Sequence, residues 1–183
     1  MAKEVRGIFS PEDISDEIER LNRISKKVTW MCDEKLEFEL VIPPTVYPPR
    51  EDTDLIAQQI IRLGPGDGRK ALEIGCGSGA LSLLLCAKGW QVSACDINPY
   101  AVAASRGNLA NSGFVADVVE CGPGSDSRAW LQNKPFDLII WNLPYLERPE
   151  QDTELLGPFE ESSLSDLEDE GVMELLARSI TCE

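Results

Sequence analysis

The strongest constraint on the fold of this chain is the alternation of strand-type and helix-type segments between residues 70 and 141. Short runs rich in Ile, Val and Leu are separated by stretches with helix start and stop signals, such as Asn98-Pro99 before one helix and Gly113 after it. This alternation is typical of an α/β fold in which crossover helices join the strands of a parallel sheet. The predicted strands are 70–75, 91–96, 115–121 and 137–141, and the predicted helices between them are 79–88 and 99–111.

The residues before this segment predict an N-terminal extension. Ile and Leu recur at helical spacing after Ser10 and Pro11, and apolar and charged residues alternate over 35–42 as in a half-buried strand. We therefore expect two domains, a helix and β-hairpin extension at 1–45 and an α/β domain at 46–183. The further predicted elements are a helix at 11–25, a hairpin of 28–32 with 35–42, a helix at 52–63 and a last helix at 165–180.

Charge and residue counts exclude several function classes. The 183 residues include 32 acidic and 17 basic side chains, and the net charge of −15 repels nucleic-acid backbones unless a basic partner supplies charge. The absence of histidine excludes imidazole bases, Ser/His and Cys/His nucleophiles and His-ligated metals. The six cysteines form no Cys-x-x-Cys pair, so we expect reduced thiols and no metal site. The first twenty residues are too charged for a signal peptide, so we expect a cytoplasmic protein.

The first predicted strand of the α/β domain runs into a glycine-rich loop, G-C-G-S-G at 75–79, and a helix opens at once. Glycines let a ligand approach the backbone closely, and the helix N-terminus offers N–H groups and a positive dipole. Asp96 ends the next strand, where its carboxylate can accept hydrogen bonds from both hydroxyls of a ribose. These features predict an adenosine-containing cofactor, with a glycine-rich turn that binds nothing as the alternative. The loop also satisfies the loose dinucleotide fingerprint, so the cofactor's identity stays open at this point.

The fourth predicted strand of this domain runs into Asn142-Leu143-Pro144-Tyr145. Ligands of open α/β sheets sit outside the carboxyl ends of the strands, so this tetrapeptide faces the same crevice as the glycine loop. The side-chain oxygen of Asn142 and the backbone carbonyl of Leu143 can both accept from one NH2 group, while Pro144 fixes the turn and Tyr145 supplies a flat wall. Such a site would orient a planar nitrogen toward an electrophilic methyl group, a reaction that depends on positioning. An ordinary proline turn is the alternative.

Together these motifs resemble those of a known family. The run E-I-G-C-G-S-G at 73–79 is similar to the first motif of class I S-adenosylmethionine-dependent methyltransferases, which have a Rossmann-like sheet. N-L-P-Y at 142–145 resembles the catalytic motif of methyltransferases that act on planar nitrogen. With V-Y-P-P-R-E-D-T at 46–53 and C-D-I-N-P at 95–99, the chain resembles the HemK family of release-factor glutamine methyltransferases, in particular its short archaeal and eukaryotic branch.

The resemblance implies a cofactor, a substrate and a partner. The cofactor would be S-adenosylmethionine, and the methyl acceptor would be the side-chain nitrogen of a glutamine in the Gly-Gly-Gln loop of a translation release factor. A small zinc-binding activator subunit would cover the sheet edge near 115–121. The catalytic residues implied are Asn142, Leu143, Pro144 and Tyr145, and the cofactor-binding residues are Thr53, Glu73, Gly75, Cys76, Gly77, Gly79, Asp96, Ile97 and Asn142.

Departures from the family pattern keep other functions open. HemK relatives usually have N-P-P-Y, and N-L-P-Y is also the form of the rRNA adenine dimethylases, so an rRNA or DNA adenine methyltransferase is the main rival. An acidic residue that often contacts the adenine of the cofactor has no clear counterpart, and Glu120 and Asp126 are the candidates. No strand pattern follows Tyr145 although the family's sheet has seven strands, so we expect a sheet truncated after its fourth strand, with completion of the sheet by another chain as the alternative. A non-catalytic, methyltransferase-like binding protein is therefore a further alternative, and an NAD-type dehydrogenase lacks an obvious proton donor here.

Overall fold

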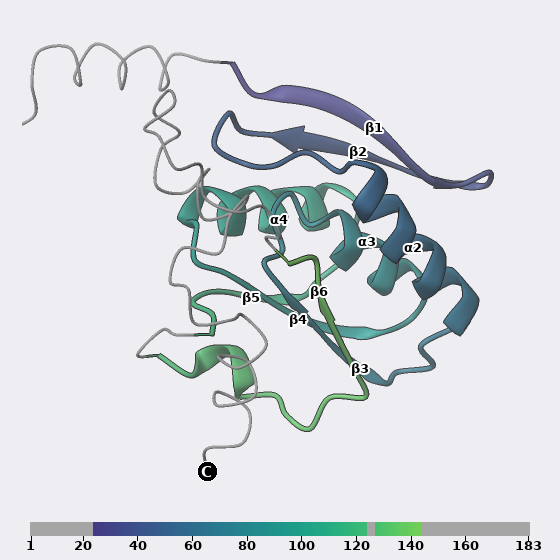
Figure 1. The fold of residues 1–183 in the computed structure, drawn as a ribbon, viewed down its shortest axis with the longest axis vertical. Coiled ribbons are helices and arrows are strands. Elements are labelled where there is room, and N and C mark those ends of the chain that lie inside the picture. Colours follow the sequence, from purple (N-terminus) through teal and green to yellow (C-terminus); the bar gives the residue numbers. More distant parts are fainter. Residues whose placement is uncertain (1–23, 124–126, 144–183) are drawn as a thin grey trace, which may run out of the picture.

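The protein is a mixed α/β structure with a parallel sheet, as the alternating pattern predicts (Figure 1). The computed structural model describes residues 24–123 and 127–143. The helix predicted at 165–180 and all but the last two residues of the helix predicted at 11–25 lie outside these ranges. In chain order the elements are β1 (Lys26–Asp33), β2 (Leu36–Ile42), α2 (Glu51–Leu63), β3 (Lys70–Ile74), α3 (Ala80–Ala87), β4 (Gln91–Asp96), α4 (Pro99–Asn111), β5 (Asp117–Glu120), the 3-10 helix η1 (Ala129–Leu131) and β6 (Leu138–Trp141).

The parallel sheet has the strand order β5-β4-β3-β6, so the chain reverses its direction of travel across the sheet at β3. β3 pairs in parallel with β4, where Ile74 lies opposite Cys95, and with β6, where Ile74 lies opposite Trp141. The carboxyl ends of three strands therefore meet at one edge of the sheet. An edge of this kind, at the point where the strand order reverses, is where open α/β sheets bind ligands.

Buried apolar side chains lie on both faces of the sheet, as is typical of a parallel sheet that is covered on both sides. α2, α3 and α4 lie over one face, and η1 packs against the other (Figure 1). Side chains alternate between the two faces along each strand, as the pleat requires. Ala71, Val92, Ala94, Val118 and Ile140 belong to the core on the helix side, and Leu72, Ile74, Cys95, Trp130 and Leu131 belong to the core around η1.

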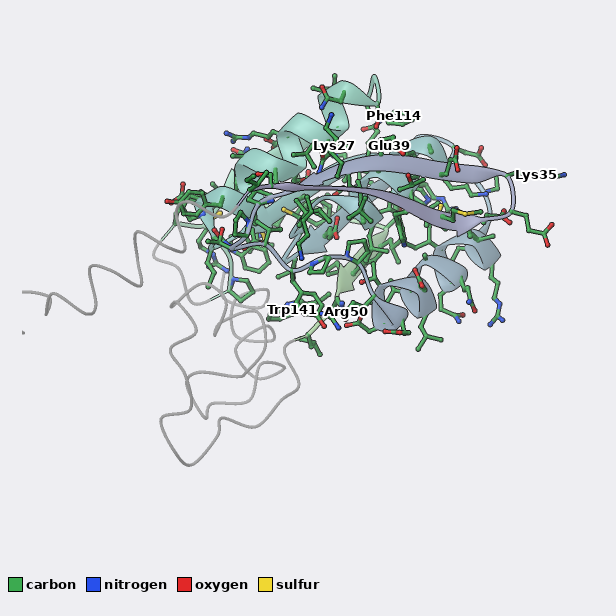
Figure 2. All side chains as sticks on the ribbon, turned by 90° about the horizontal axis from the view of Figure 1, so that it is seen from above. Lys27, Lys35, Glu39, Arg50, Phe114 and Trp141 are labelled. Carbon is green, nitrogen blue, oxygen red and sulfur yellow. The ribbon has the colours of Figure 1, made fainter. Side chains whose placement is uncertain are left out.

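The N-terminal hairpin packs on the outer side of the three helices and makes a third layer (Figures 1 and 2). Phe38, Leu40 and Ile42 point inward and are buried, so the alternation predicted for 35–42 is confirmed. The indole Nε1 of Trp30 donates a hydrogen bond to Asp54 of α2 at 2.8 Å. The hairpin thus shares its core with the helices that cover the sheet.

The end of β4 and the start of α4 follow the predicted signals closely. Asn98 caps α4, because its side-chain oxygen accepts from the backbone N–H of Tyr100 at 2.9 Å. Its Nδ2 donates to the carbonyl oxygen of Thr45 at 2.9 Å, which ties the proline-rich segment to this end of the sheet. By contrast, β5 is shorter than the predicted 115–121, and Val115 is 93% exposed.

No helix in residues 24–123 and 127–143 has the length and apolar character needed to cross a membrane.

Candidate active site

The glycine loop leaves β3 with three residues in the left-handed region, which favours glycine at each of them. Gly75 has φ +69°, Gly77 has φ +52° and Gly79 has φ +80°. Their surroundings differ. Gly75 is exposed and Gly77 half-buried, whereas Gly79 is buried, and a Cβ on Gly79 would lie 2.6 Å from Oγ of Ser105. Gly75 and Gly77 therefore leave backbone uncovered by a side chain at the carboxyl end of β3, and Gly79 allows α3 to pack closely on α4.

Four of the backbone N–H groups of this loop are bonded to acceptors within the protein. Gly75 and Cys76 both donate to the carbonyl oxygen of Cys95, at 2.8 and 3.0 Å. Gly77 donates to Oδ2 of Asp96 at 2.8 Å, and Gly79 donates to the carbonyl oxygen of Cys76 at 2.8 Å. A loop that binds a pyrophosphate turns such donors toward the ligand. Here four of them are engaged, one by a carboxylate that repels phosphate, so the loop favours a cofactor without phosphate at this place.

Asp96 lies at the end of β4, beside the glycine loop, where the ribose interpretation requires it. Its Oδ1 accepts from the backbone N–H of Asn98 at 2.9 Å, and Gly77 holds its Oδ2. Burial raises the pKa of the Asp96 carboxyl, and the N–H groups of Asn98, Gly77 and Ile97 oppose that rise. A carboxylate has about four lone-pair sites, so the fixed group retains acceptor capacity for a ribose hydroxyl beside these N–H groups. The neighbouring Ile97 is 50% exposed and offers an apolar surface next to it.

Glu73 lies beneath the loop and is buried, with the hydroxyl of Ser82 donating to its Oε2. Burial raises the pKa of Glu73 to about 8, the nearby charge of Asp96 adds to the rise, and the bond from Ser82 opposes it. Cys76 is also buried, and burial raises the pKa of its thiol well above the ordinary range. Neither side chain is a mobile surface group, and the Cys76 thiol is a poor nucleophile because nucleophilic attack requires the thiolate.

Asn142 follows β6 and reaches across to the start of α2. Its Nδ2 donates to Oδ2 of Asp52 at 3.0 Å, a bond between residues 90 positions apart in the chain. Thr53, predicted as a cofactor neighbour, is buried, and its hydroxyl accepts from the backbone N–H of Arg50 at 3.3 Å, which closes the first turn of α2. Leu143 is half-buried next to Asn142, and the predicted Pro144 and Tyr145 lie outside the described residues.

Two aromatic residues border the bare glycines. A Cβ on Gly75 would lie 3.7 Å from Nε1 of Trp141, and one on Gly77 would lie 3.8 Å from the carbonyl oxygen of Tyr47. The guanidinium of Arg50 lies 5.2 Å from the centre of the Tyr47 ring, a cation–π distance. Figure 2 shows Arg50 and Trp141 at the same edge of the molecule. The glycine backbone thus lies between the proline-rich segment and the end of β6.

Two residues that form long-range hydrogen bonds in this region were not predicted from the sequence. Asp52 is half-buried and binds Asn142, yet its position in the first turn of α2 suggests only a favourable interaction with the helix dipole. Asn108 is buried in α4 and donates to the carbonyl oxygens of Val41 and Ser78, at 3.1 and 2.9 Å. A polar residue among the apolar positions of a helix was the available signal for Asn108, but the pattern does not name its partners.

Comparison with protein families identifies the domain around this site. Residues 49–181 match the family described as "Methyltransferase small domain". The chain is 33% identical over 122 residues to a release factor glutamine methyltransferase of Geobacter sulfurreducens, covering 66% of this chain and 40% of that protein. It is 28% identical over 127 residues to a ribosomal RNA small subunit methyltransferase C of Alcanivorax borkumensis, covering 69% of this chain and 38% of that protein. The chain therefore spans about two fifths of the length of these relatives.

Solved structures share the fold. A ribosomal protein L11 methylase from Lactobacillus delbrueckii superimposes with a TM-score of 0.51 and 20% identity, over 62% of this chain and 65% of that one. A 16S rRNA N2 methyltransferase of T. thermophilus, solved with AdoMet and guanosine, gives a TM-score of 0.57 and 21% identity, over 78% of this chain and 38% of that one. At these identities the likeness establishes the Rossmann-like fold.

Proposed function

The chain belongs to the methyltransferase small domain family, and on that premise we propose that it is an S-adenosylmethionine-dependent N-methyltransferase. The observation that carries the proposal is the meeting of three groups at one sheet edge. These are the bare glycines after β3, the fixed carboxylate after β4 and the amide of Asn142 after β6.

The residues around the glycine loop fit this cofactor. Gly75 and Gly77 allow close approach to the backbone, Asp96 retains acceptor capacity for a ribose hydroxyl, and Ile97 offers an apolar contact for the adenine. Four of the loop's amides are engaged within the protein, as suits a cofactor that brings no pyrophosphate. When bound, S-adenosylmethionine supplies a methyl group already activated by a positively charged sulfur. The chain's remaining task is to hold a nitrogen lone pair in line with that methyl, so the lack of histidine is no obstacle.

For the acceptor we propose an NH2 group on a planar carbon, bound by the Oδ1 of Asn142 and the carbonyl of Leu143. The Nδ2 of Asn142 faces Asp52, so its Oδ1 is directed elsewhere. Two acceptors on one NH2 group would fix the plane of an amide and the direction of its lone pair. Pro144 and Tyr145 complete this motif in the proposal.

The substrate we favour is a glutamine side chain of a protein such as a translation release factor, in the cytoplasm. Support comes from the relatives named release factor glutamine methyltransferase and from the P-P-R-E-D-T run at 48–53. The net charge of −15 suits a basic protein loop better than a nucleic acid. A small zinc-binding activator at the open edge of β5 belongs to the same proposal, and the 93% exposed Val115 beside that edge supports it.

A second candidate acceptor is the amino group of an RNA base. The relatives named ribosomal RNA small subunit methyltransferase C favour it, as does the N-L-P-Y form of the motif at 142–145. The exocyclic amine of a base is also planar and would use the same two acceptors. The charge of this chain would then require a basic partner to bring RNA close.

Substitution of Asn142 tests the proposal. Transfer of labelled methyl from S-adenosylmethionine is measured with a release-factor protein, with a variant that lacks the loop glutamine, and with an rRNA fragment. We expect methylation of the release-factor protein alone. In Asn142→Ala the rate of methyl transfer should fall by at least about 100-fold, because two positioning contacts become one. The affinity of this variant for the cofactor should stay within a few fold of wild type. Asn111→Ala, at an exposed position of α4, is the matched control. Equal loss of transfer and cofactor binding would contradict the role assigned to Asn142, and methylation of RNA alone would replace the glutamine assignment.

A further inference from the structure

The bond between Asp52 and Asn142 joins the first turn of α2 to the end of β6. Neither its length, 3.0 Å, nor its half-buried setting is unusual for a structural contact. What matters is its direction, because Asn142 donates and Asp52 accepts. The bond involves the side chain that, under the proposed function, selects the methyl acceptor.

Asp52 is itself fixed by two hydrogen bonds from Thr53. Its Oδ1 accepts from the backbone N–H of Thr53 at 2.7 Å and from the hydroxyl of Thr53 at 3.3 Å. The same hydroxyl accepts from the backbone N–H of Arg50, so the group is built into the first turn of α2. With Oδ1 engaged in this way, Oδ2 is the oxygen that faces Asn142. The carboxylate is therefore a fixed acceptor presented to the amide.

A carboxylate has acceptors and no donor, so the amide can face it only through Nδ2. The two ends of an Asn amide are almost equal in size, and packing alone does not distinguish one orientation from its 180° flip. With Nδ2 toward Asp52, Oδ1 points away as an acceptor for an NH2 group. In the flipped orientation Asn142 would present its own NH2 group to the substrate's, donor against donor.

We propose that Asp52 is a positioning residue that sets the orientation of the Asn142 amide and so keeps Oδ1 directed at the acceptor nitrogen. This inference rests on the proposed function and adds to it a residue that lies outside the N-L-P-Y motif. Asp52 acts through Asn142 and needs no contact with the cofactor or the methyl group. It also gives the first turn of α2 a role in catalysis, since the turn carries the acceptor that orients the strand end.

Two substitutions at Asp52 separate this role from a purely structural one. Asp52→Ala and Asp52→Asn remove the same charge from the same helix terminus. In Asp52→Ala the amide of Asn142 is free to flip. In Asp52→Asn the new oxygen accepts from Thr53 as before, and the new Nδ2 faces Asn142. Asn142 then turns its oxygen toward residue 52 and its nitrogen toward the substrate.

The expected order of kcat is wild type, then Asp52→Ala, then Asp52→Asn. We expect Asp52→Ala to lose a few fold and Asp52→Asn about 10-fold more, because a donor then faces a donor. The affinity for S-adenosylmethionine should stay within about twofold in both variants. Glu51→Gln, which removes a charge from an exposed position of the same turn, is the control and should keep the wild-type kcat. A structural role predicts the reverse, with the near-isosteric Asn less harmful than Ala, and that order would overturn the proposal.

A second readout does not depend on activity. In the 15N NMR spectrum the side-chain NH2 of Asn142, assigned through Asn142→Ala, should show slow proton exchange in wild type and faster exchange in Asp52→Ala. Unchanged exchange would show that Asp52 does not hold the amide and would overturn the inference. A wild-type chain that binds cofactor but methylates neither protein nor RNA would instead overturn the proposed function, and the NMR comparison would still decide the contact.

Discussion

The fold changes the acid–base chemistry of Glu73, because burial raises the pKa of its carboxyl group. The carboxyl group is buried on the helix side of β3, where the hydroxyl and the backbone N–H of Ser82 both oppose the effect of burial. Burial disfavours the charged form of a carboxyl group. With a pKa raised to about 8, Glu73 carries its proton at neutral pH.

This shift predicts a pH dependence of stability. The folded state keeps the proton of Glu73 up to a pKa of about 8, whereas the ordinary value is 4.5, so the folded state binds more protons between these values. The contribution of Glu73 to the free energy of unfolding should therefore be largest below pH 4.5 and should fall as the pH rises to 8. Glu73→Gln removes that contribution, and we expect it to be close to wild type near pH 4.5 but more stable than wild type by about 4 kcal/mol at pH 8.

Urea unfolding at pH 5 and pH 8 measures this difference. Glu37→Gln, at an exposed position of β2, is the control and should show the same difference from wild type at both values. A Glu73→Gln variant whose difference from wild type does not change with pH would contradict the assignment of a raised pKa.

At the scale of the elements, Asn108 joins the three layers. Its Oδ1 accepts from the backbone N–H of Val41 at 2.9 Å, and its Nδ2 donates to the carbonyl oxygens of Val41 and Ser78. One side chain of α4 thereby completes the backbone bonding of β2 and contacts the glycine loop. A buried amide with all these partners supports a single arrangement of the layers, because an arrangement that left some of its hydrogen bonds unmade would cost free energy.

Asn108→Ala leaves these backbone groups without their partner, and we expect a loss of about 3 kcal/mol in the free energy of unfolding, since buried unsatisfied groups cost about 1–3 kcal/mol each. Hydrogen exchange at the Val41 amide should accelerate before the sheet opens. The exposed Asn111→Ala on the same helix controls for helix propensity. Equal stability of the two variants would show that the hairpin docks without this contact.

The elements themselves were largely predictable, and their long-range contacts were not. The bounds predicted for α3 and α4 agree with Ala80–Ala87 and Pro99–Asn111 to within one residue, because capping and glycine signals are local. η1 was missed, since a single 3-10 turn leaves no periodic pattern. Asn142 lies 90 positions from Asp52. Val41 and Ser78 lie 67 and 30 positions from Asn108, and no local pattern identifies such distant partners.

At the scale of the whole molecule, the order β5-β4-β3-β6 brings the candidate residues together. The glycine loop, Asp96 and Asn142 follow three adjacent strands, and their convergence at one edge follows from the parallel sheet predicted from the sequence. The same arrangement leaves β6 at the border of the described sheet, with Ile139 40% exposed. The predicted truncation after the fourth strand concerns residues outside the described ranges.

We expect the sheet edge formed by the carboxyl ends of β3, β4 and β6 to bind S-adenosylmethionine and not a dinucleotide. Calorimetric titration with S-adenosylmethionine, its demethylated product and NAD tests it most directly, with Asp96→Ala as the paired variant. We expect micromolar binding of the first two and none of NAD, and a loss of about 1.5–3 kcal/mol in Asp96→Ala, the range for hydrogen bonds to a charged group. Binding of NAD, or no binding of any of the three ligands by a chain shown to be folded by circular dichroism, would show that this edge is not an S-adenosylmethionine site.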